Sequence, residues 1–411
     1  MTSRTPSTPV TSSRRRAVTA ALVCAALLGT SLATAGTSAA KDRSPARDES
    51  SLRKAAAGAV AAGSVGYLVR VDDGSGVTAL GTGLADRATR RPLRADDQFE
   101  IGSNTKTFMA TIALQLVAED KLALTDTVEQ HLPGVVPNGE KITVRMLLQH
   151  TSGLFDYTED EAFGKALVSG SKHPWTPKEI VAIATRHAPT FAPGAKDKWA
   201  YSNTNYILVG MLLEKITGRS PATLVQQRIA GPLGLTRTYL PSRSATNTGS
   251  GYAHGYLLTF TGAAPRYTDV STWPLGNWAG TAGAIISTPQ ELARFLSALL
   301  GGTLLPREQL ALMKQVVPVG GGNGYGLGLL SFATPCGTVW GHNGGTLGHE
   351  SLMVASADGR RTTITDATTA LIDEDATDDA ATKLGDAKEL AQLTAVCQME
   401  GKVVPTSGQK G

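Results

Sequence analysis

Alternating apolar positions predict strands near both ends of the chain, and helical spacing predicts a long helical segment between them. Two strands, Val65–Val71 and Val77–Leu84, flank the polar turn Asp72–Gly76 and predict a β-hairpin. An Ala-rich helix over Leu52–Ala62 precedes this hairpin and stops at Gly63. A short strand over 98–101 then leads into a helix over 106–118, whose apolar stripe is Phe108, Ile112, Leu114 and Val117.

From about residue 122 to 275 helical patterns alternate with Gly- and Pro-containing loops, and few segments look like strands. The expected helices are Val144–Gln149, Lys178–Arg186, Asn205–Thr217 and Pro221–Ile229. Residues 282–287 and a helix over Pro289–Leu300 then lead back to strands at Tyr325–Phe332, Thr338–Trp340, Glu350–Ala355 and Arg361–Ala367. A helix over Ala376–Val396 closes the chain.

These elements predict an α/β (α+β) fold in which helices flank an antiparallel sheet and a mainly helical lobe is inserted. We expect one domain over 52–398, with the sheet lobe at about 52–121 and 276–398 and the helical lobe at about 122–275. Residues 399–411 are expected to form a loose tail. The glycines over 320–324 are not followed by Lys-Ser/Thr, so they predict a turn and no phosphate cradle.

The first 40 residues predict a secretory signal peptide. Arg14–Arg16 precede the apolar run Ala17–Leu32, and small residues allow cleavage after Ala35 or Ala40. A retained membrane anchor is the alternative, but no second apolar span follows, so no stable anchor is expected. The paired arginines also allow twin-arginine export. We therefore expect a secreted protein with a flexible lead over residues 41–51.

Charge and cysteine content fit an exported protein that binds no nucleic acid. The chain has 411 residues and a net charge of +4, and residues 1–40 contain four arginines and no acid, so the remainder is neutral. Beyond Cys24 only Cys336 and Cys397 remain, and in an oxidising compartment such a pair predicts one disulfide. Two free buried thiols are the alternative.

No metal or organic cofactor is expected. The cysteines and histidines lack zinc spacing. An acidic run precedes the last predicted helix, where it is better explained as charge stabilisation of the helix N-terminus; its members are Asp373, Glu374, Asp375, Asp378 and Asp379.

Three short motifs carry the candidate chemistry. Ser103 and Lys106 lie three positions apart at a helix start, where a lysine of lowered pKa can take a serine proton; an N-cap serine and a solvated lysine would look the same. Tyr201 can carry a proton, and the amide of Asn203 can orient Lys106 or bind a substrate amide. The Gly-rich segment at His342–Gly344 follows a strand. Each feature alone also fits an ordinary turn or core position.

Together, and in this order, the motifs Ser103–Lys106, Tyr201–Asn203 and His342–Gly344 resemble those of the serine penicillin-recognising hydrolases. This family includes class C β-lactamases and soluble D-alanyl-D-alanine carboxypeptidases, and a related motif set marks class A enzymes. The flanking segments 147–154, 206–210 and 278–286 also resemble the family, so the similarity covers about residues 52–398.

The resemblance implies a mechanism through an acyl-enzyme. Ser103 would attack a carbonyl, Lys106 and Tyr201 would move protons, and the backbone N–H groups of Ser103 and Gly345 would bind the oxyanion. It also implies a disulfide that brackets the last motif. The side chains and backbone implied to bind substrate are Asn203, Trp278, His342, Asn343, Gly344, Gly345 and Thr346. The implied substrates are small peptides resembling peptidoglycan stems, and β-lactams would act as covalent inhibitors.

One departure from the family concerns substrate specificity. The carboxypeptidases bind the terminal carboxylate with a strand arginine and hydroxyl groups, whereas Gly328, Asn343 and Gly345 occupy the matching positions here. The sequence therefore favours a carboxypeptidase-type enzyme but leaves open an esterase or a D-stereospecific (amino)peptidase. A β-lactamase and a non-catalytic penicillin-binding protein are weaker alternatives.

Overall fold

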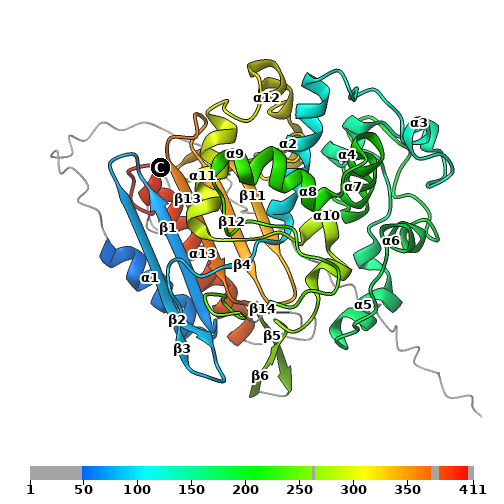
Figure 1. Cartoon of the computed structure of the whole chain (residues 1–411). Coiled ribbons are helices and arrows are strands. Elements are labelled where there is room, and N and C mark those ends of the chain that lie inside the picture. Colours follow the sequence, from blue (N-terminus) through cyan, green and yellow to red (C-terminus); the bar gives the residue numbers. More distant parts are fainter. Residues whose placement is uncertain (1–48, 248, 262–263, 372–378, 406–411) are drawn as a thin grey trace, which may run out of the picture.

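The computed structural model describes residues 49–247, 249–261, 264–371 and 379–405 (Figure 1). The predicted signal peptide and residues 41–48 of the predicted lead lie outside these ranges. Residues 49–51 already belong to helix α1 (Glu49–Ala61), which begins before the predicted start at Leu52. Within the described ranges, no helix is both long and apolar enough to cross a membrane.

An antiparallel nine-stranded sheet joins the two ends of the domain. Its strand order is β3-β2-β1-β13-β12-β11-β10-β9-β8. The strands are β1 Gly66–Asp72, β2 Val77–Asp86, β3 Arg91–Pro92, β8 Val317–Gly320, β9 Asn323–Tyr325, β10 Leu330–Thr334, β11 Gly337–Gly345, β12 Glu350–Ala355 and β13 Thr362–Ala367. Because β1 pairs with β13, with Tyr67 opposite Ala367, everything between the first hairpin and the last strands is inserted into one sheet.

Side-chain alternation along β1 separates two hydrophobic cores. Tyr67, Val69 and Val71 pack with α1 and with α13 (Asp379–Met399) on one face, whereas Leu68 belongs to the larger core on the other face. That second face is covered by α11 (Pro289–Leu300) and α2 (Thr105–Ala118) (Figure 1). The rings of Phe108 and Phe295 join these two helices, with centroids 3.6 Å apart.

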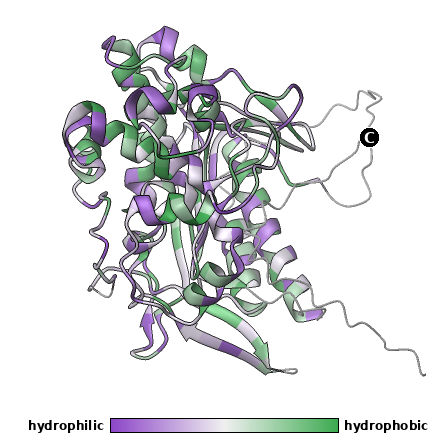
Figure 2. Cartoon of the chain, turned by 90° about the vertical axis from the view of Figure 1, so that its right-hand side faces the viewer, coloured by the Kyte–Doolittle hydropathy of each residue, from purple (hydrophilic) through white to green (hydrophobic). Residues whose placement is uncertain are grey.

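The predicted helical lobe is present and gathers around α7 (Asn203–Thr217), which contacts α2, α4 and α6. The remaining helices are α3 Val128–His131, α4 Val144–Gln149, α5 Glu161–Val168, α6 Pro177–Ala184, α8 Pro221–Val225, α9 Gly231–Leu233, α10 Gly280–Gly283 and α12 Arg307–Met313. A π-helical stretch, Gln226–Ala230, continues α8. These helices carry both hydrophilic and hydrophobic residues, as expected for helices with one buried face (Figure 2).

One hairpin was not predicted, and one predicted strand was wrong. The segment 122–275 contains a hairpin of β5 (Tyr256–Thr261) and β6 (Ala264–Asp269), and β14 (Thr369–Leu371) adds parallel to β5. Tyr256, Leu257 and Leu258 are consecutive apolar residues, so this segment lacks the alternation of apolar and polar residues that predicts a strand. β5 is recognised by its pairing with β6 and with the distant strand β14. The predicted strand over 325–332 is instead split by a turn in which Gly326 N donates to Leu329 O at 2.8 Å.

The chain ends are partly described. Of the five acids placed at the N-terminus of the last helix, Asp379 is the first residue of α13, while Asp373, Glu374, Asp375 and Asp378 lie outside the described residues, as does Ala376. Gly321 and Gly322 form the predicted turn, between Gly320 at the end of β8 and β9, which contains Gly324. Residues 406–411 of the predicted tail are also outside the described ranges.

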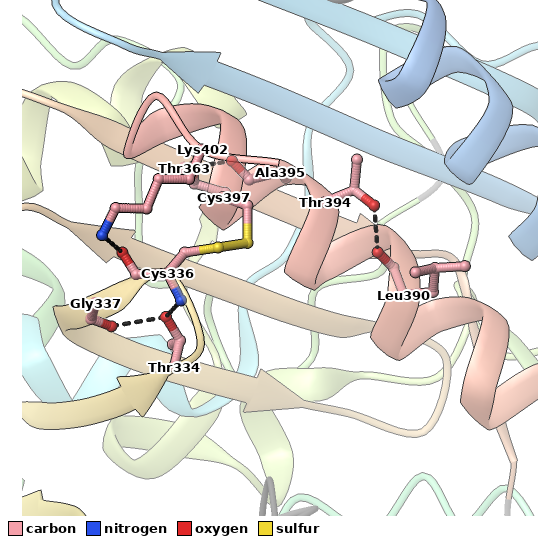
Figure 3. The surroundings of a disulfide bond; sticks show 9 residues. All are labelled: Thr334, Cys336, Gly337, Thr363, Leu390, Thr394, Ala395, Cys397 and Lys402. Atoms are coloured by element: carbon pink, nitrogen blue, oxygen red, sulfur yellow. Dashed lines mark hydrogen bonds between the residues drawn. A yellow bond between two sulfur atoms is a disulfide. The ribbon is translucent and has the colours of Figure 1, made fainter. Parts of the chain in front are cut away.

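The predicted disulfide between Cys336 and Cys397 is present, with Cα atoms 5.1 Å apart. It ties the turn between β10 and β11 to the C-terminal part of α13 (Figure 3). Lys402 adds a second link, because its Nζ donates to the backbone oxygen of Cys336 at 2.9 Å. The strand that carries the third motif is therefore fixed at the end opposite that motif.

Candidate active site

Ser103 lies in a 3-10 turn, Gly102–Asn104, directly before α2. A two-stranded sheet of β4 (Phe99–Glu100) and β7 (Ile286–Ser287) leads the chain into this turn. Gly102 has φ of +55°, and a Cβ atom there would lie 2.5 Å from the backbone nitrogen of Gly345. Glycine is required because the backbone at residue 102 is in the left-handed region and touches β11 at this point.

Lys106 is fully buried, and its Nζ lies 2.9 Å from Ser103 Oγ. It donates to Asn203 Oδ1 at 2.8 Å and to the backbone oxygen of Ala282 at 2.7 Å. Both carbonyl oxygens can only accept, so they hold two N–H groups of the lysine. The remaining position on Nζ faces Ser103. In the neutral amine this position is a lone pair, which is the geometry needed to take the serine proton.

Tyr201 completes this group of side chains. Its ring centroid lies 4.8 Å from Lys106 Nζ, within cation–π distance. The Tyr201 ring also packs against His150, and the centroids of the two rings lie 4.3 Å apart. The Tyr201–Asn203 motif occupies the residues immediately before and at the start of α7, as the sequence predicted. The first two motifs therefore meet, although 97 residues separate Lys106 from Asn203.

The third motif lies on a strand edge beside the Ser103 turn. β10 pairs with β11 only as far as Gly341. Residues 342–345 therefore pair with β12 along one edge, while β10 does not pair with them along the other edge. Thr346 N donates to His349 O at 2.9 Å, and the antiparallel alternation then directs the N–H of the preceding residue, Gly345, away from β12. Gly344 also packs tightly, since a Cβ there would lie 2.0 Å from Ile101 O. The two predicted oxyanion donors thus lie on touching segments.

The substrate-binding roles of His342 and Thr346 stay predictions. Both side chains are buried, with 0% and 1% exposure. His342 lies between Tyr325 and the backbone of Asn343, while the Thr346 hydroxyl accepts from the backbone nitrogens of Gly348 and His349. Through these hydrogen bonds both residues support β11 and its turn. In this segment Asn343 and Gly345 keep partial exposure.

Trp278 and Gly328 bear on the predicted substrate cleft. The Trp278 side chain belongs to the larger core, and its backbone oxygen accepts from the Tyr157 hydroxyl at 2.7 Å, so its contact with substrate stays a prediction. Gly328 is packed against α2, where its backbone oxygen accepts from Thr107 Oγ1 at 2.8 Å. A Cβ atom at Gly328 would lie 2.5 Å from Ala110 Cβ, so a side chain would not fit there without a shift; the match of this position to the family's arginine stays a prediction.

Sequence reasoning missed three buried residues that support the motifs: His150, Tyr325 and Asp156. His150 Nε2 and His342 Nε2 lie 3.1 and 3.0 Å from the Tyr325 hydroxyl. Asp156 accepts hydrogen bonds from the backbone nitrogen and the amide of Asn203. The signal for His150 was present, because it lies in the flanking segment 147–154 that resembles the family.

Burial and the positive charge of Lys106 lower the pKa of His342 to about 3. The pKa of His150 is also lowered well below its ordinary value, mainly by burial and then by Lys106. Both imidazoles are therefore neutral near neutral pH. The histidine of the third motif does not supply a positive charge to the site.

The fold and these contacts define a serine acyl hydrolase of the penicillin-recognising type, and the chain belongs to the Beta-lactamase family, whose model matches residues 52–385. A D-stereospecific amidohydrolase from a Streptomyces species is 38% identical, with a TM-score of 0.73 over 83% of this chain and 98% of that one. A D-amino acid amidase from Ochrobactrum anthropi SV3 is 28% identical, with a TM-score of 0.73 over 85% of this chain and 98% of that one.

Among curated proteins, Penicillin-binding protein 4* of Bacillus subtilis is 28% identical over 69% of this chain and 63% of its own length. The chain thus spans less than two thirds of that relative. Other relatives include a D-aminopeptidase of Brucella anthropi and a candidate D-alanyl-D-alanine carboxypeptidase of Escherichia coli. The matching model shows the family, while these relatives are named for different activities.

Proposed function

We propose that the protein is a serine hydrolase that cleaves amide bonds on the carboxyl side of D-amino acid residues, without strict need for a free terminal carboxylate. The observation that carries this proposal is the arrangement of Lys106, in which two carbonyl oxygens direct the third position of Nζ to Ser103 Oγ at 2.9 Å. The D-stereospecific amidohydrolase and D-amino acid amidase relatives support the substrate class.

The reaction follows from these positions. Ser103 Oγ attacks the substrate carbonyl while its proton passes to neutral Lys106, with the Tyr201 ring beside Lys106. The N–H groups of Ser103 and Gly345 bind the oxyanion. As the C–N bond breaks, the leaving amine takes up the proton through Lys106 and Tyr201, and an ester to Ser103 remains. Water then attacks this ester, giving the free acid and restoring the serine hydroxyl.

A strict D-alanyl-D-alanine carboxypeptidase is the second candidate, favoured by the motif set itself. It is weakened by Gly328, the residue that the sequence matches to that class's carboxylate-binding arginine and that is packed against α2 in this protein. We also propose that the protein is exported, because a disulfide such as Cys336–Cys397 persists in oxidising compartments.

The test compares the acid, the amide and the methyl ester of one D-Ala-D-Ala peptide, with the L-Ala-L-Ala amide as stereochemical control and Ser103→Ala as background. We expect amidation of the terminal carboxylate to change kcat/KM by less than about tenfold, or ~1.4 kcal/mol. A far larger loss would support the strict carboxypeptidase. Equal turnover of the L-peptide, or cleavage that persists in Ser103→Ala, would refute the proposal.

A further inference from the structure

Asp156 is a buried acid that lies one side chain away from Lys106. It belongs to the loop before the 3-10 turn Tyr157–Glu159 and is 6% exposed. Its Oδ2 atom accepts from Asn203 N at 3.0 Å and from Asn203 Nδ2 at 2.9 Å. Its Oδ1 atom accepts from Thr158 N at 3.0 Å and from Thr158 Oγ1 at 2.9 Å. The side chain therefore receives two donors on each oxygen.

This pattern fits the ionised form of Asp156. The backbone nitrogens of Asn203 and Thr158 can only donate, so a proton on Asp156 would have to point at the Thr158 hydroxyl, which would then lose its own bond to Oδ1. Burial raises the pKa of Asp156, and the hydrogen bonds from Asn203 and Thr158 together with the charge of Lys106 act in the opposite direction. A carboxylate that can only accept also decides how the neighbouring amide lies.

Asn203 has an amide group that could lie either way round, and the two orientations differ in what they present to Lys106. With Nδ2 toward Asp156, the carbonyl Oδ1 points at Lys106 Nζ, 2.8 Å away. Reversing the amide would place oxygen against oxygen at Asp156 and N–H against N–H at Lys106. Both contacts would be repulsive, so the carboxylate holds the amide in the orientation that the lysine needs.

We propose that Asp156 is a positioning residue that acts through Asn203, fixing the acceptor that orients Lys106 toward Ser103 and balancing the lysine's charge. This inference rests on the proposed function for its catalytic meaning, but the contacts themselves do not depend on the substrate. Apart from Asp156, the groups around Lys106 include the backbone oxygen of Ala282 and the side chains of Ser103, Asn203, Tyr201, Tyr206, and the neutral His150 and His342.

The same side chain must therefore affect both the rate and the pH dependence of acylation. Asp156→Asn removes the negative charge, so the ammonium form of Lys106 is less stabilised and its pKa should fall. It also removes the constraint on the Asn203 amide. We expect the acid limb of the acylation profile to move to lower pH while the maximum rate constant falls at least about tenfold.

A double-mutant cycle separates positioning from a general loss of stability. The acylation rate constant of Ser103 is measured with a β-lactam by intact-mass spectrometry for Asp156→Asn, Asn203→Ala and the double variant. If Asp156 acts through Asn203, adding Asp156→Asn to the Asn203→Ala variant should lower the acylation rate constant by less than about a further threefold. Asp160→Asn, the same change at the N-cap of α5, is the matched control and should stay within about twofold of wild type.

A readout without turnover keeps the inference separate from the proposed function. Lysine labelled with 13C at Cε is titrated by NMR, and the Lys106 signal is assigned by its loss in Lys106→Arg. The titration of Lys106 should move to lower pH in Asp156→Asn and not in Asp160→Asn. Asp156→Ser, a smaller neutral acceptor, is used where Asp156→Asn does not fold.

An unchanged Lys106 titration in the Asp156 variants would overturn the inference, as would wild-type acylation or fully additive losses in the cycle. A wild-type protein that no β-lactam or D-amino acid ester acylates would instead count against the proposed function, while the NMR titration would still decide the role of Asp156.

Discussion

The hydroxyl of Tyr325 donates a hydrogen bond to Nε2 of His342 across 3.0 Å inside the protein. The direction of this hydrogen bond follows from what the Nδ1 atoms of His342 and His150 contact. His342 Nδ1 faces the carbonyl of Asn343 and must carry a hydrogen, so Nε2 accepts. His150 Nδ1 lies beside two N–H donors, Ser202 N and Asn205 Nδ2, so its Nε2–H donates to Tyr325. A one-way chain of hydrogen bonds therefore supports Tyr201 at one end and β11 at the other.

Tyr325→Phe should destabilise the fold by about 2–4 kcal/mol, because it leaves two buried imidazole nitrogens without a partner. Acylation of Ser103 should also slow, since Tyr201 packs on His150 and Asn343 follows His342. Urea denaturation and acylation kinetics measure the two effects. The control is Tyr267→Phe, which removes a half-buried hydroxyl bonded to Gly63 O far from the site. Equal losses in the two variants would contradict the role given to Tyr325.

Stability should fall with acid between about pH 6.5 and pH 3. Unfolded His342 takes up a proton below its ordinary pKa of about 6.5, whereas folded His342 resists protonation until about pH 3. The unfolded state then binds more protons, so the free energy of unfolding decreases as pH falls, by up to about 1.4 kcal/mol per pH unit for this group. His342→Asn should flatten the pH dependence measured by urea denaturation. An equally steep dependence in this variant would show that other groups cause it.

Lys106→Arg should reduce acylation at least about 100-fold, the low end for loss of a general base. Arginine keeps the charge but does not give up its proton, and its planar group cannot meet the same three partners. Stopped-flow acylation by a β-lactam measures the effect, and circular dichroism checks that the fold is kept. Near-wild-type acylation would exclude Lys106 as the proton acceptor.

Loss of the disulfide should lower the free energy of unfolding by up to about 4 kcal/mol in the chain-entropy model, because the two cysteines are 61 positions apart. The double variant Cys336→Ala, Cys397→Ala is compared with wild type by urea denaturation. A protein that begins at Lys41 should show no free thiol when denatured without reductant. Two free thiols in that titration would contradict the bridge.

The sequence predicted the parts of the site that depend on local spacing. Ser103 and Lys106 lie one helical turn apart, so their contact follows once a helix begins there. The burial of His342 could not be predicted, because it depends on Tyr325 in a neighbouring strand pair. Asp156 was equally hidden, since nothing in its own segment indicates that it faces Asn203. The hairpin of β5 and β6 was missed because it belongs to a three-stranded sheet whose third strand, β14, is distant in sequence.

The contact between the Ser103 turn and Gly345 has a kinetic consequence during synthesis of the chain. Contacts so far apart in sequence form slowly, because a long loop must close before they contribute any stability. Ser103 emerges early, but Gly345 and the edge of β11 are made only after the whole helical lobe. In a nascent chain Ser103 and Lys106 therefore lack this contact, and the site proposed for acyl transfer is assembled only when the last strands join the sheet.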